Sequence, residues 1–375
     1  MAYNGVGIPR FYIDEVQYLQ SVGFDFEKYY EDNYYAEEDE TRLTYLDNPS
    51  LFGLSPENQQ RILMNDYIKA FDTPAIINNI EGNNIGRYTA ILNHKLSNIP
   101  IGANSTTAHF RWASPDLSSN IRYENNVLNT LEPYNNGCTI INFNPTDDNF
   151  NPPEENMFNR LGLYTSLTGD ELEQVLPINI DIGSISQGIY YDLRSPDLDI
   201  EMTTEFDGFS STKTLGGSTL TNVRYSGSPW WYDVDGNKVE PWSVGESTGI
   251  TKRNGRRVWN LKFSYLADTD VFASNYMSNK YYEHSSSDST DSVYNDAGDL
   301  SDDSNDFRYT LEEDNSFIAQ VINRIGNGQR FIFQPDKNNN NPDQFAICML
   351  DKDEFSITQV AHRTYSFDLK IREVW

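Results

Sequence analysis

Side chains that could bind a metal ion or act as a nucleophile are few and widely spaced along the chain. The candidates are His94, His109, His284, His362, Cys138 and Cys348. A zinc site needs His or Cys ligands at short, characteristic spacings, and no two of these residues have such a spacing. Two distant thiols do not make a disulfide framework, and Cys348 in the apolar run FAICML is typical of a buried core residue. We therefore expect no metal site, no cofactor and a reducing compartment.

One serine lies in a motif that hydrolases use. Residues 245–249 match G-x-S-x-G, with Ser247 at the centre. A nucleophile elbow requires a strand before this motif and a helix after it. The following residues, ITKRNGRRVWNLKFSYL, instead indicate a turn and a strand. We therefore predict that Ser247 is not a catalytic nucleophile.

Residues 233–237 begin like a calcium-binding loop. An EF-hand loop needs glycine at its sixth position and a bidentate glutamate at its twelfth. Here Gly236 is fourth and Val244 is twelfth, so Asp235-Gly236 better predicts a hairpin turn. Among the 56 acidic residues, many pairs could lie roughly 5 Å apart, as a retaining glycosidase requires, but the sequence selects none. We predict that the chain has no catalytic residues and is not an enzyme.

Three tryptophans cluster around the same turn: Trp230, Trp231 and Trp242. Packing in a core or at a sheet edge is the simplest role for them. Tryptophan is also enriched in sugar-stacking platforms and as an anchor in protein interfaces. Both alternatives remain open from the sequence.

The charge of the chain excludes several classes of partner. Its formal net charge is -28, which repels nucleic-acid phosphates and anionic membrane surfaces. The one local basic cluster, residues 252–257, is typical of a hairpin turn. No stretch approaches the ~20 apolar residues of a membrane-spanning helix, and the first residues do not resemble a secretory signal. We expect no contact with nucleic acid or membrane, and self-repulsion that delays assembly.

Aromatic residues alternating with polar ones predict a mainly β protein. The chain has 24 Tyr and 20 Phe, on short runs separated by Asn, Gly, Asp and Pro. The last segment places one set of residues on the dry face of a strand: Tyr365, Phe367, Leu369, Ile371 and Trp375. An earlier segment does the same with Trp259, Leu261, Phe263 and Tyr265. The expected class is mainly β (α+β), with β-sandwich or barrel domains and a few helices.

The chain is expected to form three regions. These are an N-terminal arm and helical segment (1–84), a β-rich domain (85–175) and a C-terminal β-sandwich module (176–375) with an exposed acidic loop near 279–310. Four helices are predicted: one that Gly23 ends, one from Ser55-Pro56 to Thr73-Pro74, one from the capping box at 168–171 to Pro177, and one carrying Phe317, Val321, Ile322 and Ile325.

Two acidic segments are candidate contact regions. Residues 25–40, DFEKYYEDNYYAEEDE, predict a solvated, extended arm or a segment that wraps a neighbouring subunit. Residues 285–306 are rich in Ser and Asp and cannot bury enough apolar surface to fold alone.

Several blocks of the chain resemble virion structural proteins of tailed bacteriophages. The blocks are SISQGIYYDLRSPDLDIEMTTEFDG, TLGGSTLTNVRYSGSPWW, GRRVWNLKFSYLADTDVF and the ending from GQRFIFQPD to KIREVW. The resemblance covers residues 176–375, with a weaker likeness at RFYID. The proteins resembled are associated with the tail or baseplate. The shared blocks define a structural family and contain no catalytic motif.

The resemblance implies a role in assembly. Distal-tail and tail-tube proteins have a β-sandwich plus helix whose sheet lines or caps a ring around the tail channel. The additional N-terminal half favours a tail-end, baseplate or adaptor position. The expected partners are copies of the chain in a ring and other tail proteins, in a virion assembled in the host cytoplasm. The alternatives are a receptor-binding tail protein that recognises host-surface glycans and, with less support, a glycan hydrolase.

Overall fold

A computed structural model shows a mainly β protein with a few helices: in the part of the chain that it describes, strands greatly outnumber helices. This confirms the expected fold class. The structure describes residues 6–33, 42–64, 68–75, 84–94, 107–113, 121–130, 137–143, 157–164, 178–198, 200–206, 210–222, 227–232, 238–239, 241–242, 255–267, 271, 316–326, 328–351, 354–362 and 364–375.

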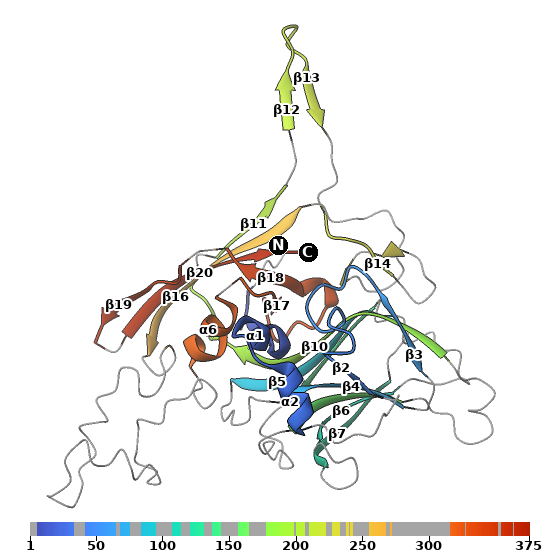
Figure 1. The fold of residues 1–375 in the computed structure, drawn as a ribbon. Helices are drawn as coiled ribbons and strands as arrows, with labels where there is room; N and C mark the ends of the chain where they lie inside the picture. Colours follow the sequence, from blue (N-terminus) through green and yellow to red (C-terminus); the bar gives the residue numbers. More distant parts are fainter. Residues whose placement is uncertain are drawn as a thin grey trace, which may run out of the picture.

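An 11-stranded antiparallel sheet, here called the large sheet, organises the molecule (Figure 1). Its main path is β11-β16-β20-β18-β17-β1-β10-β5-β8, with β19 paired to β20 and β3 to β10. The strands are β1 (Arg10–Asp14), β3 (Gln60–Met64), β5 (Ile85–His94), β8 (Cys138–Phe143), β10 (Ile178–Asp192), β11 (Glu201–Glu205), β16 (Arg256–Ala267), β17 (Phe331–Gln334), β18 (Ala346–Leu350), β19 (Ile357–Ala361) and β20 (Thr364–Glu373).

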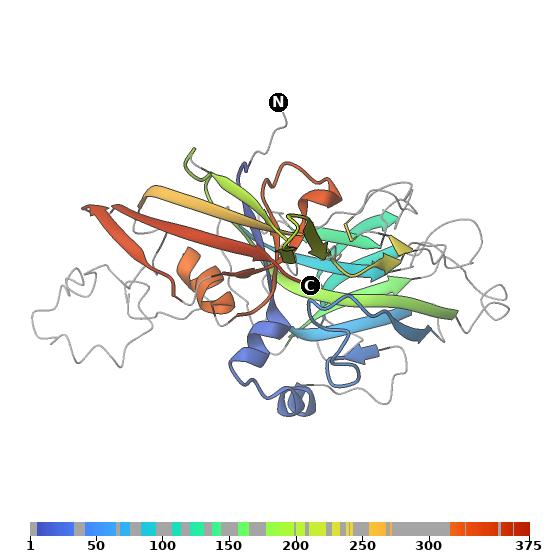
Figure 2. The ribbon, with the colours of Figure 1, turned by 90° about the horizontal axis from the view of Figure 1, so that it is seen from above.

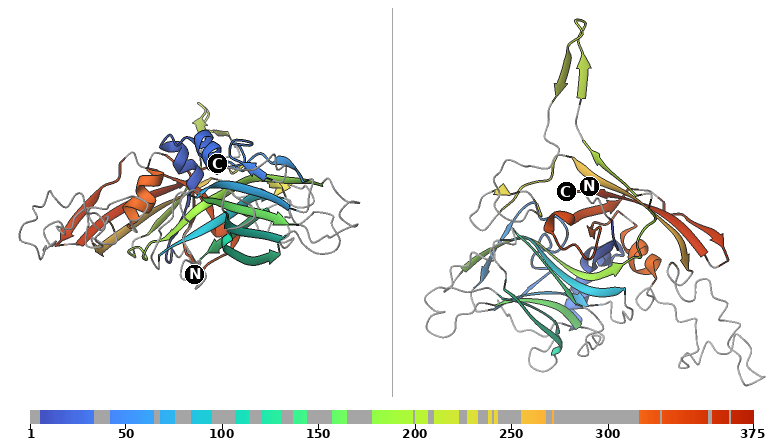
Figure 3. Two further views of the ribbon diagram at one scale, coloured as in Figure 1. Left: turned by 60° about the horizontal axis from the view of Figure 1, so that its bottom comes forward. Right: turned by 180° about the vertical axis from the view of Figure 1, so that it is seen from behind.

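A second, five-stranded sheet, the small sheet, packs against one half of the large sheet (Figure 3). It follows the order β2 (Arg42–Thr44), β4 (Ile68–Ala75), β9 (Met157–Tyr164), β6 (Thr107–Ala113) and β7 (Ile121–Thr130). Phe71 and Leu161 of the small sheet share a buried core with Ile91 and Ile185 of the large sheet. The β-sandwich of this chain is therefore formed by these two sheets.

Strand β1 lies at the centre of the large sheet because both of its edges are paired. It is antiparallel to β10 on one side and to β17 on the other. Phe11 and Ile13 face one core and Tyr12 faces another, and all three are at most 2% exposed. Because β1 is buried on both faces, its central residues do not alternate between apolar and polar side chains.

The three expected regions do not form separate sheets. Strand β1 comes from residues 1–84, β5 and β8 come from 85–175, and the remaining main-path strands come from 176–375. The boundaries at 84 and 175 therefore fall within one sheet. The physical reason is that β1 pairs with strands more than a hundred residues away, which local composition does not reveal.

Helices lie on the faces of the sheets. They are α1 (Glu15–Ser21), α2 (Phe26–Asn33), the π-helical turn η3 (Ile318–Ile322) continuing into α6 (Asn323–Ile325), and the short 3-10 turn η4 (Pro342–Gln344). Figures 1 and 2 show α1 next to β10. The helix expected around Phe317 to Ile325 is confirmed, with Phe317, Val321 and Ile325 buried against the large sheet.

The helix predicted from Ser55 to Thr73 is wrong. This stretch forms β3 and β4, which pair with β10 and β9. In β3 the buried Ile62 lies between the exposed Arg61 and Leu63, a two-residue period that the capping signal at Ser55-Pro56 obscured. Pairing with distant strands outweighs the local helix signal.

Residues 25–40 also differ from the expected extended arm, because residues 26–33 form α2. Phe26 and Tyr30 are buried in the core that the two sheets share, and the Tyr30 hydroxyl donates to the Asp72 carbonyl oxygen at 2.9 Å. Half of the supposed arm is thus a packed helix. Its remaining residues, 34–40, lie outside the described part of the chain, as do the predicted helix at 168–177 and the acidic loop at 279–310.

Two short hairpins complete the fold. The first, β12 (Ser210–Lys213) with β13 (Thr219–Asn222), projects away from the sheets (Figures 1 and 3). The second, β14 (Trp231–Tyr232) with β15 (Lys238–Val239), flanks the turn predicted at Asp235-Gly236. The antiparallel pairing of β14 with β15 shows that the chain reverses between Tyr232 and Lys238, whereas Asp235-Gly236 itself lies outside the described residues and its turn stays a prediction.

Candidate assembly surfaces

The described histidines and cysteines do not converge on a site. His94 is buried, with its Nε2 2.9 Å from the Thr139 hydroxyl, and burial lowers its pKa to about 3. His362 is exposed in the turn between β19 and β20, and Cys348 is buried in the core. Burial raises the pKa of the Cys138 thiol, so this thiol is a poor nucleophile. Among the described residues, no group of three or more His, Cys, Asp or Glu could hold a metal ion.

Other residues with candidate chemistry fall outside the description. These are Ser247 and its motif, the 233–237 loop, Val244, Lys252, His284 and the side chain of His109. The predictions made for them stay predictions.

Two of the three clustered tryptophans pack inside the protein. Trp231 and Trp242 are 2% and 3% exposed, and their ring centroids lie 5.0 Å apart. Trp242 also stacks on Phe345, at 5.9 Å between centroids. A sugar needs an exposed ring face, so these two rings support packing over a glycan platform. Trp230 is half-buried beside them.

A buried polar cluster joins α1, the large sheet and the small sheet. Asn159 of β9 donates to Glu15 Oε2 at 3.0 Å, and Arg87 Nη1 of β5 donates to Asn159 Oδ1 at 3.2 Å. Arg87 Nη1 also lies 3.4 Å from Glu15 Oε2. Burial lowers the pKa of Arg87, whereas the Glu15 carboxylate opposes that change. Because buried polar groups must be satisfied, this cluster fixes how the sheets pack.

A second buried ion pair lies within the small sheet. Arg160 of β9 donates through Nε to Asp72 Oδ1 of β4 at 2.6 Å, with a second contact between Nη2 and Oδ2. The two residues face each other across neighbouring strands. This bidentate pair sets the register of β4 against β9.

The β12–β13 hairpin is the most exposed described segment. Of residues 210–222, all but Thr214 are exposed. Leu215 in its turn is fully exposed, and Leu220 is 63% exposed. The turn is defined by Thr214 N donating to Ser218 O at 2.8 Å and Gly217 N donating to Thr214 O at 3.0 Å, with Gly217 at a φ of 83°.

Exposed leucines on an isolated two-stranded hairpin indicate a contact surface. A hairpin without a sheet or helix against it is marginally stable in water. The hairpin is also free of carboxylates, because no Asp or Glu occurs between Asp207 and Asp233. We call this hairpin, residues 210–222, the arm. In a chain of net charge -28, the arm is suited to an acidic partner surface.

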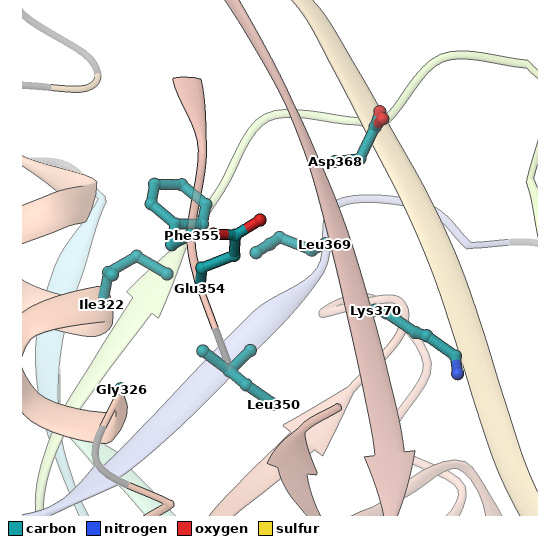
Figure 4. Close-up of a pocket in the computed structure, with 8 residues that line it drawn as sticks. All are labelled: Ile322, Gly326, Leu350, Glu354, Phe355, Asp368, Leu369 and Lys370. Carbon is teal, nitrogen blue, oxygen red and sulfur yellow. The ribbon is translucent and has the colours of Figure 1, made fainter. Parts of the chain in front are cut away.

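A small apolar hollow opens between the η3–α6 helix and β20 (Figure 4). Its volume is about 70 Å³, and Ile322, Leu350, Phe355 and Leu369 provide its apolar lining. The exposed Glu354 lies at its mouth, whereas Asp368 and Lys370 point to the other side of β20. Lys370 instead pairs with Asp351.

The outer strands of the large sheet differ in charge. At one end β11 carries Glu201 and Glu205, and charges on an edge strand discourage pairing with another chain. At the other end β8, CTIINF, is uncharged and is an edge within the described part of the chain. The arm, the hollow and the β8 edge are therefore the candidate contact surfaces.

Sequence reasoning did not single out the β12–β13 arm or the hollow. The signal for the arm was present as STKTLGGSTLTN, two Thr-rich runs around Gly-Gly. The hollow has no sequence signal, because its lining comes from three separate segments. Comparison of the chain with protein-family models, characterised proteins and solved structures gives no match. Among the described residues, no helix is long and apolar enough to cross a membrane.

Proposed function

We propose that the protein is a structural component of a bacteriophage virion, acting in a tail or baseplate ring or adaptor through assembly of subunits. The observation that carries the proposal is the β12–β13 arm, which exposes Leu215 and Leu220 outside a well-packed body. Apolar side chains exposed on a projecting element are unfavourable in a monomer, and they stabilise an assembly when a partner covers them.

The body has the properties that a ring subunit needs. Strand β1 is paired on both edges, and the Glu15, Arg87 and Asn159 cluster joins the two sheets, so the body resists deformation when neighbours bind. The resemblance of residues 176–375 to tail- and baseplate-associated proteins gives the proposal its location, in the virion tail after assembly in the host cytoplasm. Copies of the chain and other tail proteins are the proposed partners.

The alternative of a glycan-binding tail protein loses its main support. Trp231 and Trp242 are buried against each other, and Trp242 also stacks on Phe345, so neither ring offers an exposed platform. A hydrolase would need a pair of carboxylates directed into a cleft, and among the described residues that line the hollow beside α6, Glu354 lies at its mouth while Asp368 points away from it. Assembly is therefore the better-supported function.

The proposal is tested by sedimentation velocity of the full chain over a wide range of protein concentration. We expect concentration-dependent oligomers. Replacing residues 210–222 by a short Gly-Ser linker should reduce association without changing the unfolding curve, because the arm contributes little to the core. A chain that stays monomeric at every concentration, and that mass spectrometry does not find in purified virions, would overturn the proposal.

A further inference from the structure

We propose that the arm of one copy inserts Leu215 into the hollow beside α6 of a second copy, with Lys213 of the arm pairing with Glu354 at the mouth of the hollow. This inference rests on the proposed assembly function. It names the two surfaces that meet and the residues that join them.

The two surfaces match in polarity. Leu215 stands in the turn of the arm with its side chain fully exposed, so it can enter a recess without rearrangement of its own chain. The hollow has a volume of about 70 Å³, and its apolar lining comes from Ile322, Leu350, Phe355 and Leu369. Covering the leucine there removes both apolar surfaces from water.

Charge complementarity selects a second copy as the occupant. Lys213 ends β12 two residues before Leu215, and no carboxylate of the arm competes with it. Glu354 is exposed at the mouth of the hollow (Figure 4). Both halves of the contact therefore exist on every copy of the chain.

The arm cannot fill the hollow of its own copy. It projects away from the body, whereas α6 lies on the other side of β16 and β20 (Figure 1). Different patches thus meet, which makes the contact heterologous. Heterologous contacts repeated from copy to copy produce rings when the rotation closes and open arrays when it does not.

The first test is a charge exchange measured by sedimentation velocity. Lys213→Glu alone and Glu354→Lys alone each place like charges together and should weaken association about tenfold. The combined variant restores opposite charges and should recover most of the loss. Both positions are exposed, so the variants retain the fold. Single variants that associate like the original chain, or a combined variant no better than either single one, would overturn the inference.

The second test uses the leucine and a matched control. Leu215→Asp should reduce association at least tenfold, because a carboxylate would enter an apolar recess beside Glu354. Leu198→Asp removes an equally exposed leucine near β11 and should leave association unchanged. Equal behaviour of the two variants would contradict the insertion of Leu215.

Cross-linking identifies the contact directly. A Leu215→Cys chain mixed with a Glu354→Cys chain should form disulfide-linked dimers, whereas Leu198→Cys mixed with Glu354→Cys should not. The unchanged chain gives the background from Cys138 and Cys348. Oligomers without this cross-link would reject the arm-and-hollow contact while leaving the assembly function standing. A chain that never associates and is absent from virions would reject both.

Discussion

At the residue scale, stability depends on buried charged side chains that are paired with groups of opposite charge or with hydrogen-bonding partners. Glu15 and Arg87 are both buried, and Asn159 bridges them. Removing one member of a buried pair leaves the other charge without compensation, which costs more than the pair itself contributes. The sequence shows these residue types but not that they meet, because they come from α1, β5 and β9.

Asp72→Asn should destabilise the fold by about 3–5 kcal/mol, because Arg160 would keep its buried charge without the opposing carboxylate. The measurement is the free energy of unfolding from chemical denaturation. Asp181→Asn is the control, since its partner Arg61 is 70% exposed and such pairs contribute about 1 kcal/mol or less. Equal losses for the two variants would contradict the role given to Asp72.

Asp14 makes stability depend on pH. Its side chain caps α1 by accepting from Gln17 N at 2.8 Å, and burial raises its pKa to about 6. An acid whose folded pKa lies above its unfolded value of about 3.9 contributes stability below that value, and loses it as the pH rises through 6. Asp14→Asn keeps a capping oxygen without the charge.

We therefore expect the free energy of unfolding of the Asp14→Asn chain, relative to that of the original chain, to rise between pH 4 and pH 7 by up to about 3 kcal/mol. Denaturation curves at several pH values measure the gain. Parallel pH profiles for the two chains would show that Asp14 does not titrate differently in the folded state.

At the element scale, β1 holds the large sheet together through close backbone contact with β10. Gly188 pairs with Asp14, and a Cβ at Gly188 would overlap the Ile13 carbonyl oxygen and lie 2.9 Å from Glu15 N. Backbone atoms in the middle of a sheet cannot move aside. A side chain at this position therefore forces the two strands apart.

Gly188→Ala should destabilise the fold by at least about 2 kcal/mol, in line with overpacking in a core. Thermal unfolding measures the effect. Gly216→Ala is the control, because nothing lies within 4 Å of a Cβ at Gly216 and its backbone is not in the left-handed region. A Gly188→Ala chain with an unchanged melting temperature would contradict the central place of β1.

The strands that the sequence predicted best have one dry face and one wet face. In β20, Tyr365, Phe367, Leu369 and Ile371 are all at most 4% exposed, as their alternation indicated. Tyr265 was expected on the dry face of β16 but is 77% exposed. A register shift between Phe263 and Leu266 turns it outward and buries Leu266 instead.

Elements that depend on distant partners were harder to predict. Strand β1 pairs with β17, more than 300 residues away, and only three-dimensional pairing distinguishes it from the start of α1. The capping signal at Ser55-Pro56 was locally convincing, yet the chain there pairs with β10. The arm and the hollow, which carry the proposed function, depend on exposure, and a single sequence does not reveal exposure.

At the scale of the whole molecule, the net charge of -28 opposes association. Salt screens this repulsion, because the Debye length falls from roughly 30 Å at 0.01 M to about 10 Å at 0.1 M. The Lys213–Glu354 attraction is screened too, but one pair is outweighed by the repulsion between two strongly acidic bodies. We expect added salt to increase the oligomer fraction in sedimentation velocity, and a fraction that is constant or falls with salt would contradict this balance.

The central claim is that this chain is a ring-forming part of a virion tail. Electron cryo-microscopy of intact virions tests it most directly, because the large sheet and the projecting arm give the chain a recognisable shape. The account predicts density for several copies in a closed ring at the tail end or baseplate, with the arm of each copy reaching the α6 side of its neighbour. Virions whose tail density is fully explained by other proteins would contradict it.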